Sequence, residues 1–197
     1  SPLFSDRTHV AVLIEMDAEV DNLRAAWEWL YQQADSGAIT HYLPGLWRYY
    51  ERKGWFAEAA SVLAQAVQLP ALTSTQQAQW QRWWGEACYQ MGRIVECEEH
   101  LGQVLLLLGE PLPSTQGAWA RQLFRQANHQ IIYRLRSVTT GRRTLAERQP
   151  LQDASADLSL LGPIMYQSGD GLSSLTTAFW SLNLAEQAGL SPELARS

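Results

Sequence analysis

Side chains that could carry out chemistry are few and scattered in this sequence. No two of its four histidines are four residues apart, the spacing that would place two metal ligands on one face of a helix. Cys88, Cys97 and His100 could meet on two paired helices, yet a zinc site normally needs four ligands. Because a cysteine outside a disulfide packs as a small apolar side chain, we interpret both cysteines as packing residues. The histidines are His9, His41, His100 and His129.

Phosphate chemistry has no visible site either. A phosphate-binding loop needs a glycine-rich turn followed by lysine and a hydroxyl residue, and the only lysine, Lys53, stands between Arg52 and Gly54 without such a loop. No strand–serine–helix elbow is present to carry a nucleophile. We therefore expect no catalytic residue, no metal and no cofactor, and a chain that is not an enzyme. An enzyme with an unrecognised site between helices is the least favoured alternative.

Arginine is concentrated in one stretch. Residues 121–148 contain seven arginines and one acid, Glu147, which gives this stretch a charge of +6 and the remainder of the chain −11. The pattern indicates a solvated helix face with a linker, or a surface that binds an acidic protein, a nucleic acid, an anionic membrane or the acidic remainder of the same chain. The candidates for this basic patch are Arg121, Arg125, Arg134, Arg136, Arg142 and Arg143.

Composition narrows the class of protein. With 197 residues, 46% hydrophobic and 18% charged, the chain can bury a core. The net charge of −5 gives no reason to expect nucleic acid as the main partner. There is no apolar run of about 18 residues and no secretory leader, and two cysteines are too few for a disulfide framework. We therefore expect a cytoplasmic protein without a transmembrane segment.

The elements that must position any binding site are helices. Apolar residues recur at three- and four-residue steps, as in Leu23, Trp27 and Leu30, and no period-two alternation indicates a strand. We predict an all-α fold of about eight helices in a single domain over 1–197. Its parts are an N-terminal helix (10–37), a first helix pair (38–70), a second pair (76–111), a long helix with a basic linker (112–154), a third pair (155–189) and the start of a truncated helix (190–197).

Two segments repeat each other. Gly54 and Gly92 are 38 residues apart, near the period of paired-helix repeats. In each segment the glycine separates two helices, a small residue follows five positions later, a leucine four after that, and a third apolar residue three further on. The matching residues are Gly54, Ala59, Leu63 and Ala66 in one segment and Gly92, Cys97, Leu101 and Val104 in the other.

These segments resemble tetratricopeptide repeats. Tyr50 and Gly85, in the first helices of the two pairs, also fit the pattern of these repeats, and Pro70 is close to their usual closing proline. Trp47 and Cys88 depart from the pattern. A third, weaker copy consists of Gly169, Ser174, Ala178 and Ser181. The resemblance implies a right-handed superhelix of antiparallel helix pairs, interrupted by residues 112–154, in which the first helix of each pair lines a concave groove.

A narrower resemblance concerns the larger protein. The segments 21–29 and 182–189 are similar to helices of bacterial multidomain signal-transduction ATPases (STAND proteins), some of which carry a cyclase or kinase domain. The chain starts at Ser1 without a methionine and stops in what reads like another helix, so we expect a piece of such a protein. The resemblance implies a scaffold or sensor that binds other proteins, or alternatively an intramolecular regulator of a neighbouring ATPase or cyclase domain.

The groove that the resemblance implies has a mixed, arginine-bearing lining. Such a lining would favour an acidic peptide or protein segment, or another domain of the same chain, as the partner. Its candidate residues are His41, Arg48, Glu51, Arg52, Gln79, Arg82, Glu86, Tyr89 and Gln90.

Overall fold

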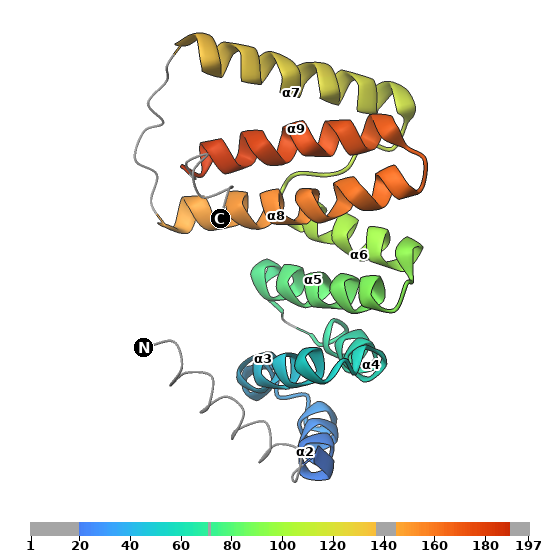
Figure 1. Ribbon diagram of the computed structural model, residues 1–197. Helices are drawn as coiled ribbons and strands as arrows, with labels where there is room; N and C mark the ends of the chain where they lie inside the picture. Colours follow the sequence, from blue (N-terminus) through green and yellow to red (C-terminus); the bar gives the residue numbers. More distant parts are fainter. Residues whose placement is uncertain (1–19, 71, 137–144, 190–197) are drawn as a thin grey trace, which may run out of the picture. The chain divides into compact units, whose positions relative to one another are not determined.

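A computed structural model describes residues 20–70, 72–136 and 145–189, and every regular element in these ranges is an α-helix (Figure 1). The all-α prediction is therefore confirmed for the described part of the chain. None of the described helices is both long enough and apolar enough to cross a bilayer. The helices are α2 (Val20–Gln32), α3 (Ser36–Lys53), α4 (Phe56–Ala66), α5 (Ser74–Gln90), α6 (Ile94–Leu107), α7 (Gln116–Arg136), α8 (Leu145–Gln167) and α9 (Gly171–Gln187).

The chain divides into two compact units, Ser1–Arg93 (unit 1) and Ile94–Ser197 (unit 2). The division falls at the Gly92 turn, inside the second predicted helix pair. One domain over 1–197 and its superhelical arrangement therefore stay predictions. The predicted N-terminal helix lies outside the described residues up to position 19, and so does the truncated helix at 190–197.

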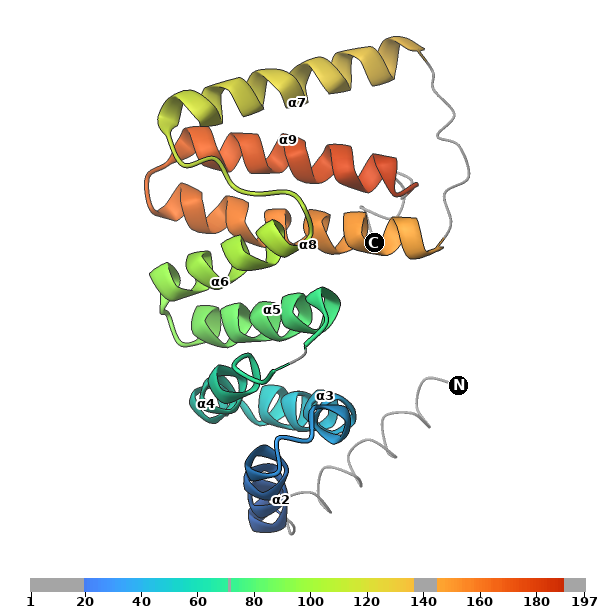
Figure 2. The ribbon, with the colours of Figure 1, turned by 180° about the vertical axis from the view of Figure 1, so that it is seen from behind.

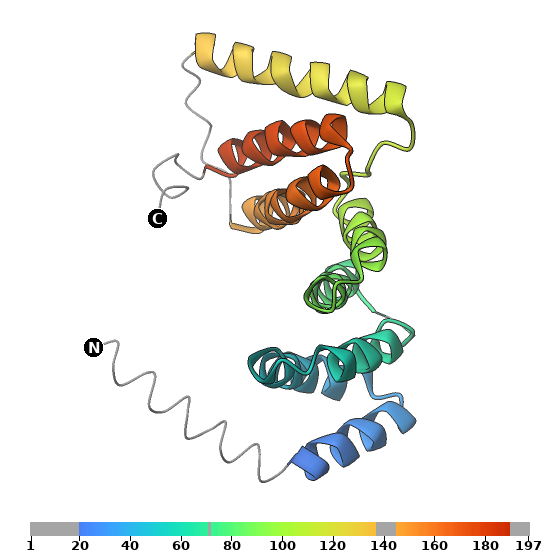
Figure 3. The same ribbon diagram turned by 45° about the vertical axis from the view of Figure 1, so that its right-hand side comes forward.

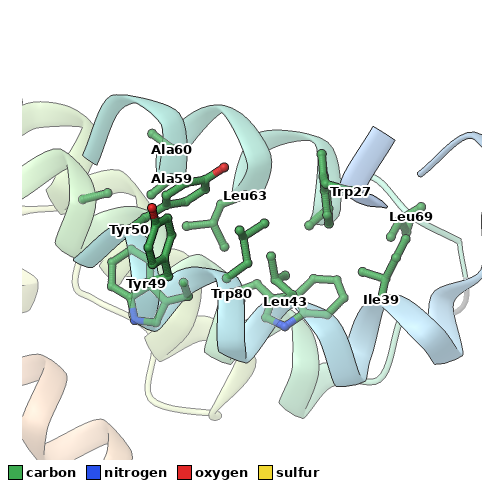
Figure 4. Packing of buried hydrophobic residues seen from close by; sticks show 14 residues of the cluster. Trp27, Ile39, Leu43, Tyr49, Tyr50, Ala59, Ala60, Leu63, Leu69 and Trp80 are labelled. Carbon is green, nitrogen blue, oxygen red and sulfur yellow. The ribbon is translucent and has the colours of Figure 1, made fainter. Parts of the chain in front are cut away.

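Unit 1 is built around large aromatic and aliphatic side chains. Helices α3 and α4 form a hairpin, α5 packs against α4 and runs along α3, and α2 packs against α3. Figure 4 shows Leu43 of α3, Leu63 of α4 and Trp80 of α5 gathered in one cluster, and all three are fully buried. Large apolar side chains thus join four consecutive helices into one core, since each gains free energy by leaving water.

The two glycines of the repeat end their helices in the same way. Gly54 and Gly92 have φ of 70° and 73°, a left-handed conformation that costs a glycine little. In each turn the residue after the glycine donates its backbone N–H to a carbonyl five positions back, Trp55 to Tyr50 at 2.9 Å and Arg93 to Cys88 at 2.8 Å. The sequence repeat is therefore a repeat of backbone geometry as well.

Polar residues fix the starts of α3 and α5. Asp35 caps α3, because its carboxylate accepts the backbone N–H of Ala38 at 2.9 Å. Thr73 and Gln76 form the reciprocal capping box that their spacing allows. Pro44 lies inside α3, which continues through it.

Unit 2 is a set of longer helices. Helix α9 lies between α7 and α8, and α6 packs against α8 (Figures 1 and 2). The expected linker is only partly tested, because residues 137–144 lie outside the described part. The linker prediction is wrong for residues 145–154, since α8 already begins at Leu145 and runs through Pro150.

Helices α8 and α9 approach each other closely through small and hydroxyl residues. A Cβ added to Gly162 of α8 would come within 3.1 Å of the Thr177 hydroxyl of α9. The hydroxyl of Ser155 donates to the backbone carbonyl of Ser181 at 2.9 Å, and the Ser181 hydroxyl donates to the carbonyl of Ser155 at 3.0 Å. Ala178 of the weak third repeat is exposed, so burial along α9 follows a different phase from the predicted one.

Candidate binding site

Helices α3 and α5, which carry all nine predicted groove residues, lie side by side in unit 1. The amide of Gln76 donates to the hydroxyl of Thr40 at 2.9 Å near their N-termini. Seven residues further along each helix, about two turns, the rings of Trp47 and Trp83 stack with centroids 5.7 Å apart and an interplanar angle of 11°. Both pairs join residues 36 positions apart, so the two helices run parallel in constant register. Parallel first helices are what stacked antiparallel pairs produce.

The nine predicted residues follow helical rows on these two helices. On α3, His41, Arg48 and Arg52 recur at steps of seven and four, and all three are exposed. On α5, Gln79, Arg82, Glu86 and Gln90 recur at steps of three and four, with the central two half-buried. Each row thus presents one side of its helix. The two remaining residues are Glu51, which is exposed, and Tyr89, which is half-buried.

Three of the nine come together electrostatically. Burial raises the pKa of Glu86, the nearby carboxylate of Glu51 raises it further, and the guanidinium of Arg82 lowers it. Glu51 belongs to α3 and the other two to α5, so the charges meet across the pair of helices. His41 turns to its own helix instead, where its Nδ1 lies 2.9 Å from the carbonyl oxygen of Gly37 and donates to it.

A pocket of about 220 Å³ in unit 1 lies elsewhere, among α2, α3 and α4, and none of the nine predicted residues lines it. Its wall includes Trp27, whose indole N–H donates to the amide oxygen of Gln65 at 2.9 Å, and Arg24, whose guanidinium lies over the Trp55 ring at 5.6 Å. The sequence did not reveal it, because its walls come from separate helices. The lining residues are Arg24, Trp27, Glu28, Tyr50, Glu58, Ser61, Val62 and Gln65.

In unit 2, a polar seam joins α7 to α9. The side chain of Asn183, fully buried, donates to the backbone carbonyl of Gln126 at 3.0 Å and to its side-chain oxygen at 2.5 Å. The amide of Gln130 donates to Asn183 at 2.6 Å and to Glu186 at 2.8 Å. His129 adds a ring nitrogen 3.2 Å from the same asparagine oxygen. This seam was not predicted, because glutamine and asparagine are ordinarily surface residues.

A second pocket, of about 180 Å³, opens at this seam. At one side the indole N–H of Trp180 donates to the carboxylate of Glu110 at 3.1 Å. The pocket lining combines polar side chains such as Arg125 and Gln126 with the apolar side chain of Leu184. The lining residues are Glu110, Arg125, Gln126, His129, Trp180, Leu184 and Gln187.

The predicted basic patch is only partly described. Arg121, Arg125 and Arg134 lie exposed on α7. Arg136 belongs to the same helix, but its side chain, like the whole of Arg142 and Arg143, lies outside the described residues. Over the ranges that the structure covers, no three His, Cys, Asp or Glu side chains are grouped so as to hold a metal ion.

Both cysteines are fully buried, as expected of packing residues. Comparison of this chain with protein families, with curated proteins and with solved structures finds no match.

Proposed function

We propose that this chain is a non-catalytic scaffold that binds a segment of a partner protein along the surface shared by α3 and α5. The parallel register of these two helices carries the proposal. Because Thr40 pairs with Gln76 and Trp47 with Trp83, the polar rows on α3 and α5 become the two sides of one continuous surface. A rigid surface of this kind binds an extended peptide or a helix without first paying for ordering itself.

The charges on this surface favour a partner segment that is mainly acidic. Arg48 and Arg52 are exposed on α3 and can each pair with a carboxylate in the forked geometry of a guanidinium. The carboxylate of Glu51 raises the pKa of Glu86, so this site favours one basic residue in the same segment. The expected ligand is thus an acidic segment with a single cation that lies between these two carboxylates.

This role agrees with the resemblance to helical-repeat regions of STAND-type signalling proteins, in which the repeats would recognise a partner and a neighbouring domain would act. An intramolecular version, in which the acidic segment belongs to another domain of the same larger protein, uses the same surface and the same chemistry.

A binding measurement with defined peptides tests the proposal. Fluorescence anisotropy would compare three synthetic peptides of equal length: an acidic one with a central lysine, its charge-reversed counterpart and a neutral one. We expect only the acidic peptide to bind. Replacing Arg48→Ala and Arg52→Ala together should weaken it by about three- to tenfold, the value of two exposed charge pairs. The same substitutions should flatten the dependence of affinity on salt.

The control is Arg24→Ala, which removes an exposed arginine from α2, outside both helices of the proposed surface, and should leave the affinity unchanged. Arg82 is kept in all variants, because its loss would also change Glu86. Equal binding of all three peptides, or an affinity that is the same with and without Arg48 and Arg52, would show that this surface is not the binding site.

A further inference from the structure

Helix α7 is oriented with two glutamines inward, on the same side as the buried Trp119, and with an apolar stripe outward. Its inner side carries Gln126 and Gln130, both buried in the seam with α9. Phe124 and Ile131, large apolar residues on the opposite side of the helix, are 72% and 55% exposed. An amphipathic helix ordinarily buries its large apolar residues. The exposure of this pair is therefore a feature to be explained rather than the usual scatter of surface apolar residues.

The seam fixes this orientation. Asn183 pairs with Gln126 and Gln130 through both its amide nitrogen and its oxygen, and Gln130 also reaches Glu186. Turning α7 about its axis to bury Phe124 would break all of these hydrogen bonds inside the protein, where unpaired polar groups are costly. The outward position of the apolar stripe is thus specified by the inward position of the amides. Figure 3 shows α7 along the side of α9, at the edge of unit 2.

The stripe has the spacing of a helix-packing seam. Ala120, Phe124, Ala127 and Ile131 follow one another at steps of four, three and four residues, the repeat that places side chains against a partner helix. Alanines alternate with the two large residues, so a partner backbone can approach closely between Phe124 and Ile131. A bilayer surface would favour a broader face of large apolar residues, because binding there scales with the apolar area inserted. This spacing favours a helix as the occupant.

Charge selects the kind of helix. Arg121 and Arg134 lie on either side of the stripe and Arg125 lies next to Arg121, and none of the three forms an ion pair with another described residue. No acidic residue occurs anywhere in 111–146. A second copy of α7 would bring like charges together, which disfavours self-association through this face. A partner helix with glutamate or aspartate beside its apolar stripe would instead pair with the arginines.

From this arrangement we propose that the outward side of α7 is a second docking surface, separate from α3 and α5, and that its occupant is an acidic amphipathic helix of a partner protein. Phe124 and Ile131 are the apolar anchors of this α7 surface. Arg121, Arg125 and Arg134 set the charge and the register of the partner.

The test uses the whole chain and a synthetic helix with leucine at heptad positions a and d and glutamate elsewhere. Anisotropy should detect binding of this probe, and a matched helix with lysine in place of glutamate should not bind. Phe124→Glu with Ile131→Glu should weaken binding at least about tenfold, since it removes both anchors. Arg121→Glu with Arg134→Glu should reverse the preference in favour of the lysine helix.

Tyr166→Glu is the matched control, because Tyr166 is also 72% exposed but lies on α8. It should leave the affinity unchanged. Thermal unfolding of every variant should match the parent chain, since all the substituted residues face solvent.

The proposal is overturned if the glutamate helix does not bind, or if it binds equally to the Phe124→Glu, Ile131→Glu variant. Binding of the chain to vesicles of anionic lipid, without binding to the glutamate helix, would identify a membrane as the occupant and equally overturn it.

Discussion

The core of unit 1 and the α7–α9 seam of unit 2 join helices by opposite means. In unit 1, Trp80, Leu43 and Leu63 fill the space among three helices with apolar side chains (Figure 4). In unit 2, the corresponding space between α7 and α9 is filled by amides and a carboxylate around Asn183. Apolar contacts gain free energy in many orientations, whereas hydrogen bonds do so in few.

The two ways of joining helices leave different side chains on the surface of each unit. The apolar core leaves the outer rows of α3 and α5 polar, so its candidate surface is charged. The polar seam uses the amides of α7 inside the unit and leaves Phe124 and Ile131 outside. The way a helix is attached thus decides the chemistry of the face it presents.

The largest effect should come from the apolar core. Trp80, which is 1% exposed, fills the centre of unit 1, and Trp80→Ala should lower the free energy of unfolding by about 3–5 kcal/mol because it removes contacts and leaves a cavity. Denaturant unfolding followed by circular dichroism measures the loss. Trp29→Ala is the control, since Trp29 is 60% exposed and its loss should cost less than about 0.5 kcal/mol. Equal losses would mean that Trp80 is not a core residue.

Substitutions in the seam between α7 and α9 should have an intermediate effect on the free energy of unfolding, and the effects of single substitutions should not add up. Asn183→Leu leaves Gln126 and Gln130 without their buried partner and should cost about 2–3 kcal/mol of unfolding free energy. Replacing the whole set with leucine (Gln126, Gln130, Asn183 and Glu186) should cost much less, within about 1 kcal/mol of the parent, because no buried polar group is then left unpaired.

Denaturant unfolding of the single and quadruple variants decides between these outcomes. If the quadruple variant loses more than Asn183→Leu alone, the seam would be a net source of stability, and its contrast with the apolar core would be one of geometry only.

The smallest effect concerns the charges between α3 and α5. The pKa of Glu86 is raised from the ordinary value of 4.5 by burial and by Glu51. Protonated Glu86 therefore contributes stability that is complete below pH 4.5 and is lost as the pH rises through the raised pKa. Glu86→Gln should therefore stabilise unit 1 at neutral pH, by no more than about 0.5 kcal/mol because the site is partly solvated, and should have no effect below pH 4.5.

Carbon-13 NMR titration of the Glu86 carboxyl gives the matching site-specific measurement. Glu51→Gln should lower its pKa without restoring the ordinary value, since burial is the larger cause of the shift. An unchanged pKa would mean that Glu51 and Glu86 do not interact across the two helices.

Much of the fold was readable in the sequence. The sequence revealed the turns at Gly54 and Gly92, because a glycine acts on the backbone within a few residues of itself. Pro150 misled: it belonged to the predicted linker, yet it lies inside α8, because a helix packed along its length can tolerate a lost hydrogen bond. Apolar residues four positions apart on α7 do not share one environment: the row Trp119, Leu123, Ala127, Ile131 runs from buried Trp119 to exposed Ile131.

The candidate binding site was likewise predictable only in its local part. Helical periodicity alone placed the charged rows of α3 and α5 on their helices. The meeting of Glu51 with Glu86, the polar seam and both pockets join residues that are tens of positions apart, and one sequence contains no signal for such pairs.

Local features could be predicted from the amino-acid order: the helices, their turns, and a spacing of glycines that implies pairing. The side of α7 that faces inward could not, because glutamine and isoleucine compete for it and the outcome depends on Asn183, more than fifty residues away. Hydrogen bonds between distant side chains, rather than hydrophobicity along the helix, made that choice.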